Sequence, residues 1–173
     1  VSRLLLGVKF DSYVSMTMSA VSELVDYIGG VSVSVEEDMT SVDERLVAGK
    51  TVLLDGKLAM LYVRARGALL DSSNTARMKR QETFLKAFIE KVSESELEGD
   101  RLLSLYETIS PFVVTNSGME IFDEMLEKLD TYSQKDVLSL KGEAVKGESY
   151  MEFYVDENAR NDILREIFYE KAD

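Results

Sequence analysis

The sequence predicts an α/β fold, and more narrowly a three-layer α–β–α sandwich with a mixed central sheet. Segments that alternate apolar and polar residues, as strands do, take turns along the chain with segments whose apolar residues recur at helical spacing. One such strand–helix–strand unit covers residues 12–35, and α/β domains are built from units of this kind. The 173 residues, of which 45% are apolar, are enough for one domain with a sizeable core.

The first half of the chain has clear element signals, because cap residues and glycines mark where its helices begin and end. Ser19 is placed to cap a first helix, which Gly29 and Gly30 end. The expected elements are a strand over 12–18, a helix over 20–28, a strand over 31–35, a short strand near 52–54, a helix to about Val63 capped by Asp55, a loop over 67–73, and a helix to about Ser93 capped by Asn74.

The second half of the chain continues the same alternation of helices and strands. Asp156 is placed to cap the last helix. The expected elements are helices over 100–109 and 118–129, strands over 137–140 and 150–155, and an amphipathic helix from Asp156 to about Glu170.

The charge of the chain is unevenly distributed. Its net charge of −12 argues against a nucleic-acid partner, because proteins of that kind usually present a basic face. Between Arg64 and Gln81, however, five basic residues stand against one acidic residue, a local charge of +4. A positive island in an acidic protein indicates an anion site. The chain has neither Cys nor His, which excludes disulfides, Ser-His-Asp and Cys-His mechanisms and the usual His-ligated zinc sites.

The spacing of the arginines predicts where that anion site lies. Arg77 and Gln81 share a helix face, which Arg80 flanks. Arg64 and Arg66 leave the preceding helix where the loop begins, so both groups can converge at the positive N-terminus of the next helix. Two guanidinium groups about 6 Å apart repel by on the order of 2–3 kcal/mol, and a bound anion relieves that repulsion. Because the arginine fork matches phosphate oxygens, the segment predicts a phosphate or diphosphate site.

Other interpretations of these residues stay open. The arginines could be surface residues paired with some of the 32 Asp and Glu residues. The Leu-, Met- and Phe-rich core could hold an alkyl chain. A cation could bind the acidic run, although such runs are more often solvated loops. That run consists of Glu36, Glu37, Asp38, Asp43 and Glu44.

The start of the chain suggests that it belongs to a longer protein. It opens on Val1 without an initiator Met, and no signal peptide is recognisable. No run of about 18 apolar residues occurs, so the sequence predicts no membrane-spanning helix within the chain.

Short stretches spread along the chain together resemble the LytR–CpsA–Psr family of bacterial cell-envelope proteins. Their order and spacing agree with the family pattern over most of the chain, which makes the resemblance more specific than any single motif. The stretches are residues 5–14 (LLGVKFDSYV), 24–33 (LVDYIGGVSV), 37–39 (EDM), 54–56 (LDG), 59–66 (AMLYVRAR), 74–81 (NTARMKRQ), 84–87 (FLKA), 114–116 (VTN), 142–143 (GE) and 149–150 (SY).

The resemblance implies a phosphotransferase. Family members take a glycan polymer, such as wall teichoic acid or capsular polysaccharide, from a polyprenyl-pyrophosphate carrier and attach it to peptidoglycan by a phosphodiester. The implied fold is an α–β–α sandwich with a hydrophobic pocket for the lipid tail. The implied location is the extracytoplasmic face of the bacterial membrane, with an N-terminal transmembrane anchor. The implied partners are the lipid-linked glycan, peptidoglycan and the membrane surface.

The resemblance also assigns roles to particular residues. Arg66 and Arg77 are the residues that it implies stabilise charge during transfer, while Arg80 could have a structural role. Many members carry Asp where this chain has Asn74, so either Asp71 is expected to take over or Asn74 serves only as a cap. The residues assigned to the pyrophosphate are Arg64, Arg66, Arg77, Arg80 and Gln81.

The resemblance implies a divalent metal, usually magnesium, whose acidic ligands are expected upstream of Val1. No residue of this chain is assigned to it. Residues 1–173 are therefore expected to be a single LytR–CpsA–Psr-type domain that lacks its N-terminal part, and the fragment itself could be inactive. Two alternatives follow, a non-catalytic module that binds polyprenyl phosphate and a cell-envelope regulator. The net charge and the lack of a readable helix-turn-helix argue against regulation through DNA.

Overall fold

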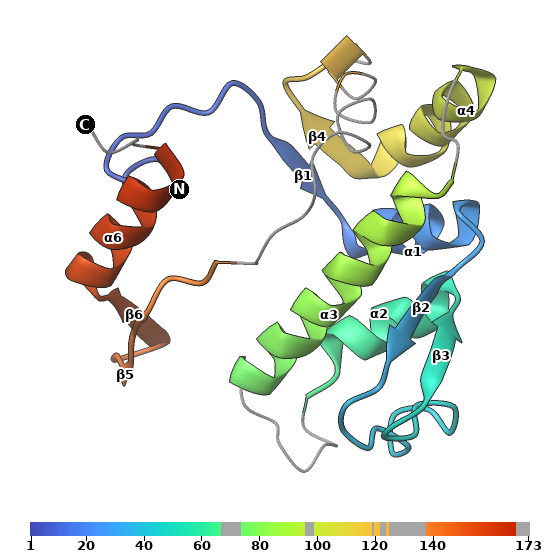
Figure 1. The fold of residues 1–173 in the computed structure, drawn as a ribbon, viewed down its shortest axis with the longest axis horizontal. Helices are drawn as coiled ribbons and strands as arrows, with labels where there is room; N and C mark the ends of the chain where they lie inside the picture. Colours follow the sequence, from blue (N-terminus) through green and yellow to red (C-terminus); the bar gives the residue numbers. More distant parts are fainter. Residues whose placement is uncertain (67–73, 96–98, 119, 122–123, 125–137, 169–173) are drawn as a thin grey trace. The chain divides into compact units, whose positions relative to one another are not determined.

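The protein is an α/β protein, as predicted, and Figure 1 shows its computed structural model. The structure describes residues 1–66, 74–95, 99–118, 120–121, 124 and 138–168. The contacts within the chain divide it into two compact units, one of residues 12–134 and the other of residues 1–11 with 135–173. The expected single domain over residues 1–173 stays a prediction.

The unit of residues 12–134 contains most of the regular structure. Its elements are β1 (Val14–Met16), α1 (Met18–Tyr27), β2 (Val31–Ser34), β3 (Thr51–Leu54), α2 (Gly56–Arg64), α3 (Asn74–Ser93), α4 (Gly99–Ile109), the 3-10 helix η1 (Ser110–Phe112) and β4 (Val113–Thr115). Of the predicted helix over 118–129, residues 120, 121 and 124 are helical, and most of the others lie outside the described residues.

The strands of this unit form two antiparallel pairs. In one pair Val14 of β1 lies opposite Thr115 of β4, and in the other Val31 of β2 lies opposite Leu54 of β3. The described strands of the whole chain thus pair as three separate two-stranded antiparallel sheets. The α/β class holds, but no parallel pair of the expected mixed central sheet occurs among these strands.

The hydrophobic core lies where α1, α2 and α3 meet the β2–β3 pair. Val25 of α1, Leu58 of α2 and Leu54 of β3 are fully buried, and Phe84 of α3 packs against the same cluster. Figure 1 shows α3 running across α2 and β2, and residue contacts join α3 to both elements. The core therefore holds the C-terminal end of α2 against the N-terminal half of α3, where the predicted anion site lies.

In the unit of residues 1–11 and 135–173, the described residues include a hairpin followed by a helix. Its elements are β5 (Gly142–Lys146), β6 (Met151–Val155) and α6 (Glu157–Phe168). Asp156 caps α6 as predicted, because its Oδ1 accepts hydrogen bonds from the Asn158 and Ala159 amides at 2.9 and 3.1 Å. The strand predicted over 137–140 is wrong for residues 138–140, since the strand before β6 begins at Gly142, while residue 137 lies outside the described residues.

Candidate functional site

The candidate site is built from the end of α2 and the beginning of α3. Asp55 starts α2, as predicted, by accepting a hydrogen bond from the Leu58 amide at 2.7 Å. The helix ends at Arg64, and Ala65 leaves it in an extended conformation with φ −51° and ψ 137°. Arg66 therefore follows the helix on a segment whose direction differs from the helix axis.

Asn74, the first residue of α3, joins two arginines. Its Oδ1 accepts hydrogen bonds from Nη2 of Arg77 at 2.8 Å and from Nη2 of Arg66 at 3.2 Å. The spacing of these residues predicted that arginines from the two elements would meet at this helix end, and Arg66 and Arg77 do. This contact is a role that the predicted cap did not include, because the side-chain oxygen of Asn74 links two cations.

Arg77 retains a donor that the described structure does not use. Its Nε is buried, and no hydrogen-bond partner for this atom occurs among the described residues. A buried donor without a partner carries an energetic cost, which a bound acceptor would remove. Arg77 therefore combines a fixed guanidinium group with an unused donor, as an anion ligand should.

Arg64 and Arg66 line a pocket of about 600 Å³. Lys57, in the first turn of α2, adds a third cation to its wall, and Met60 and Leu61 supply apolar surface. Such a mixture suits a ligand that has both an anionic and an apolar part. The pocket is lined by Ser22, Ser41, Val42, Lys57, Met60, Leu61, Arg64, Ala65 and Arg66.

Gln81 and Arg80 bind the backbone of the segment that carries Arg64 and Arg66. Gln81 Nε2 donates to the Val63 carbonyl at 3.2 Å. Arg80 is only 5% exposed, and its two terminal nitrogens donate to the Ala65 carbonyl and to the Glu37 carboxylate. The predicted clamp thus separates into exposed or half-buried arginines and one buried arginine that already has an acidic partner.

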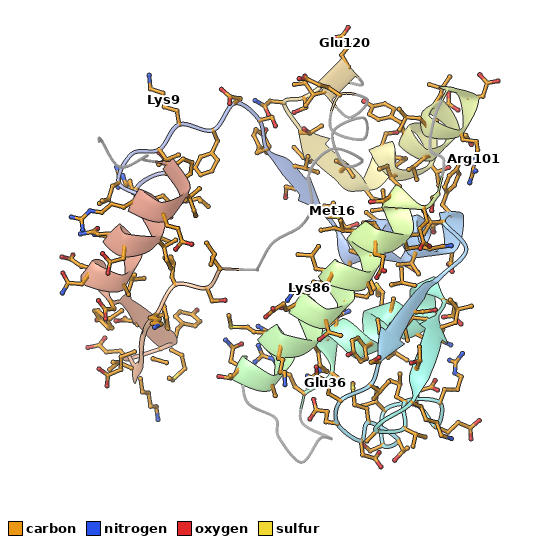
Figure 2. The ribbon with its side chains drawn as sticks, viewed as in Figure 1. Lys9, Met16, Glu36, Lys86, Arg101 and Glu120 are labelled. Carbon is orange, nitrogen blue, oxygen red and sulfur yellow. The ribbon has the colours of Figure 1, made fainter. Side chains whose placement is uncertain are left out.

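The acidic run after β2 is used mostly for ion pairs and turns. Glu37 pairs with Arg80, and Glu36 pairs with Lys79 at 2.6 Å; Figure 2 labels Glu36 beside α3. Asp38 accepts two hydrogen bonds from Thr40. No group of three or more acidic residues that could hold a metal ion occurs within the described parts of the chain. The carboxylates of Glu36, Glu37 and Asp38 thus already have partners within the chain.

Charge and burial shift several pKa values around the site. Burial, helped by the nearby Glu36 carboxylate, raises the pKa of Tyr62 to about 12. The hydrogen bond to Glu36 raises the pKa of Lys79. Hydrogen bonds from Arg45 lower the pKa of Asp43 to about 2. All three side chains therefore keep their usual neutral-pH charge states over a widened pH range.

The spacing of residues in the sequence did not predict the two partners of Arg80, and the predicted role of Asp71 stays a prediction. Glu37 and the Ala65 carbonyl hold Arg80, yet Glu37 stands 43 residues from Arg80, too far for any helical spacing to connect them. The position of Glu37 in a resembling stretch was the only available signal. Asp71, predicted as possible polar support, lies outside the described residues.

Within the ranges given above, no helix combines the length and the apolar character that crossing a bilayer requires.

The chain belongs to the LytR–CpsA–Psr family, whose family model matches residues 3–168. No curated protein sequence matches it. Among solved structures, TagU of B. subtilis is 25% identical with a TM-score of 0.70 and is covered to 70%, over 99% of this chain. The Lin1025 protein of Listeria innocua is 25% identical with a TM-score of 0.69, covering 95% of this chain and 68% of that one.

TagT is a further similar protein. The B. subtilis TagT structure is 21% identical with a TM-score of 0.71, and TagT bound to LIIa-WTA is 23% identical with a TM-score of 0.75. In both cases the match covers 95% of this chain but only 62% of TagT. The likeness to TagT shows the fold alone, and the chain spans less than two thirds of the TagT length.

Proposed function

We propose that this chain carries the pyrophosphate-binding part of an enzyme that transfers a cell-wall glycopolymer from a polyprenyl-pyrophosphate carrier to peptidoglycan. The family supports this proposal, because its members are phosphotransferases of cell-wall synthesis. The similar fold of TagT, a protein that binds LIIa-WTA, supports a glycopolymer of the wall teichoic acid type. Capsular polysaccharide is the other cargo class that fits.

The observation that carries the proposal is the meeting of Arg66 and Arg77 at one neutral oxygen. Asn74 Oδ1 holds both guanidinium groups without cancelling their charge. Arg64, the last residue of α2, lies on the wall of the neighbouring pocket. Three cations from two elements can therefore face the several oxygens of a diphosphate, and the apolar side chains of the pocket can contact the adjoining lipid.

The proposed reaction needs charge stabilisation more than covalent help. A peptidoglycan hydroxyl attacks the phosphorus that carries the glycan and gives its proton to a base that we assign to no described residue. The bond to the polyprenyl phosphate breaks, and polyprenyl phosphate leaves. Negative charge grows on the bridging and leaving oxygens, where Arg66 and Arg77 would stabilise it. Gln81 is expected to orient the group, since Nε2 has a second N–H besides the one given to Val63. Magnesium is part of this proposal as a further source of charge stabilisation, and we assign no step and no described residue to it.

We place the protein at the extracytoplasmic face of the bacterial membrane. The family consists of cell-envelope proteins, and a polyprenyl-linked donor and a peptidoglycan acceptor meet at that face. An N-terminal membrane anchor is part of this proposal, while nucleic acid is not an expected partner.

The first prediction tests the clamp through Arg77→Ala. The affinity for farnesyl pyrophosphate, measured by isothermal titration calorimetry, is expected to fall roughly 10- to 100-fold, because a charge-assisted hydrogen bond contributes about 1.5–3 kcal/mol. The fold should survive, since Arg77 is not a core residue. Transfer of polymer from a lipid-linked donor to peptidoglycan should fall in parallel.

The matched control is Arg101→Ala, because Arg101 is an exposed arginine of α4, which Figure 2 labels well away from the α2–α3 junction. The hydroxyl of Tyr27 donates to the backbone carbonyl of Arg101, so the substitution keeps that hydrogen bond. Equal affinities of the two variants for farnesyl pyrophosphate would contradict the proposed clamp. Binding that depends on Arg77 without any transfer would favour the non-catalytic binding module instead.

A further inference from the structure

The most deeply buried charged contact at the site involves Arg80. The guanidinium group is 5% exposed and pairs with Glu37, whose side chain is 29% exposed. Its other terminal nitrogen donates to the Ala65 carbonyl, while Nε has no partner among the described residues. A guanidinium group at this depth depends on its acidic partner, because the charge has little water around it.

Arg80 and Gln81 fasten the same short segment to α3. Arg80 holds the carbonyl of Ala65, which is the residue between Arg64 and Arg66, and Gln81 holds the carbonyl of Val63. The two neighbouring side chains thus fix alternate carbonyls at the end of α2. The direction in which Arg66 leaves that segment determines whether it reaches Asn74 of α3.

We propose that Glu37 is a positioning residue for the pyrophosphate clamp and acts through Arg80. The Glu37 carboxylate holds Arg80 in the orientation that grips Ala65, and this grip places Arg66 beside Arg77 at the Asn74 oxygen. Under this proposal Arg80 holds two elements together instead of contacting phosphate, which is the structural role considered for it beside its assignment to the pyrophosphate. The inference rests on the proposed pyrophosphate site.

Glu37 also balances the charge of the site. It neutralises Arg80, so the arginines whose positive charge remains for a ligand are Arg64, Arg66 and Arg77, beside Lys57 on the pocket wall. Without the Glu37 carboxylate, the buried guanidinium group of Arg80 would be stabilised by turning towards any available anion or water. It would then leave the Ala65 carbonyl, and the spacing between Arg66 and Arg77 would no longer be fixed.

The adjacent residue provides a matched control. Glu36 pairs with Lys79 through side chains that are 49% and 67% exposed, and such surface pairs contribute little. Glu36→Gln and Glu37→Gln therefore remove the same charge from neighbouring positions of one loop, but only the second disturbs a buried guanidinium group.

The test compares the affinities of the full chain for farnesyl pyrophosphate and farnesyl monophosphate. Two correctly spaced arginines favour the diphosphate, so Glu37→Gln is expected to lower the ratio of the two affinities roughly 3- to 10-fold, about the effect of one net hydrogen bond. Glu36→Gln should leave the ratio within about twofold. A general loss of stability would weaken both ligands alike and leave the ratio unchanged.

Each outcome separates this inference from the proposed function. If Arg77→Ala weakens pyrophosphate binding but Glu37→Gln leaves the ratio unchanged, the positioning role is wrong and the clamp stands. If Arg77→Ala has no effect either, the clamp itself is wrong.

Should Glu37→Gln fail to fold, the double variant Glu37→Gln/Arg80→Gln removes the uncompensated buried charge. The same fall in the ratio is then expected. An unchanged ratio in this double variant overturns the proposal.

Discussion

At the scale of single residues, the neutral side chain of Asn74 distinguishes this site. Two guanidinium groups share its Oδ1, which is a neutral acceptor. The resemblance to the family places an aspartate here in many members, and a carboxylate would cancel one of the two positive charges. Asn74 keeps both charges available, so the arginines are held at close range by a dipole rather than by a counter-ion.

The second prediction follows from this shared oxygen. Asn74→Ala removes the acceptor, so Arg66 and Arg77 should repel each other into separate orientations. The affinity for farnesyl pyrophosphate is expected to fall roughly 2- to 10-fold, the equivalent of about 0.5–1.5 kcal/mol for a hydrogen bond. Isothermal titration calorimetry measures this change, and the unfolding midpoint should move little because Asn74 is exposed.

Asn74→Asp provides the comparison, because its carboxylate keeps both acceptor contacts but adds a negative charge. We expect an affinity between those of the wild type and Asn74→Ala. An alanine variant that binds as tightly as the wild type would show that the shared oxygen does not organise the arginines.

At the scale of elements, the contact between α1 and α2 leaves no room for a side chain at Gly56. The amide of Gly56 donates to Asp26 Oδ1 at 2.7 Å. A Cβ at this position would lie closer than 3.0 Å to the Ser22 carbonyl oxygen, which belongs to the backbone of α1 and cannot turn aside. The glycine thus lets α2 start directly against α1, and α2 carries Arg64 at its other end.

The third prediction is that Gly56→Ala destabilises the protein. The two helices must separate to admit the methyl group, which should cost about 1–3 kcal/mol of the free energy of unfolding, as overpacking typically does. Chemical denaturation followed by circular dichroism measures the loss. Pyrophosphate affinity should also fall, because α2 positions Arg64 and Arg66.

Gly118→Ala is the matched control, since a Cβ at Gly118 meets nothing within 4 Å. Its free energy of unfolding should stay within about 0.5 kcal/mol of the wild type. Equal stabilities of the two variants would mean that α1 and α2 can move apart freely.

The elements that sequence reasoning placed well are those with local signals. Asp55 and Asp156 each lie within three residues of the amides that they cap, so a short window contains both partners. The predicted Ser19 cap was wrong because α1 begins at Met18, after Thr17, whose amide donates to the distant Phe112 carbonyl at 2.9 Å. No local pattern records such a contact.

Short exposed strands were the hardest elements to predict. β4 has three residues and β5 has five exposed ones, so neither has an apolar alternation long enough to recognise. Within the site, too, only residues that are close in sequence could be placed. Helical spacing places Arg77 and Gln81, whereas the buried pair of Arg80 and Glu37 depends on the tertiary fold.

At the scale of the whole molecule, the acidic composition is offset locally by specific partners. The net charge is −12, yet Asp43 is held by Arg45 through contacts of 2.8 and 2.9 Å. Arg45 also reaches Asp55, the cap of α2, at 3.3 Å. One arginine therefore connects the loop before β3 with the helix that carries Arg64, and acidic residues contribute to the order of the site although they would repel its ligand.

The fourth prediction concerns the pH dependence of stability, to which Asp43 contributes on the acid side. The pKa of Asp43 falls from 3.8 to about 2 in the folded protein, so between these values the unfolded chain binds more protons than the folded one. The stability that Asp43 provides is therefore present above about pH 4 and is lost as the pH falls towards 2. Hydrogen bonds from Thr40 also lower the pKa of Asp38, so Asp38 affects stability in the same direction.

Tyr62 should limit stability on the alkaline side. Burial raises its pKa from 10.0 to about 12, so its contribution is complete below pH 10 and is lost as the pH rises towards 12. Denaturation midpoints measured from pH 2 to pH 12 should thus form a plateau with two falling limbs. Asp43→Asn should flatten part of the acid limb and Tyr62→Phe the alkaline limb. Burial of Tyr62 and the nearby carboxylates of Glu36 and Glu37 both raise its pKa. An alkaline limb that stayed unchanged in Tyr62→Phe would contradict this prediction, because it would mean that Tyr62 ionises near its ordinary pKa.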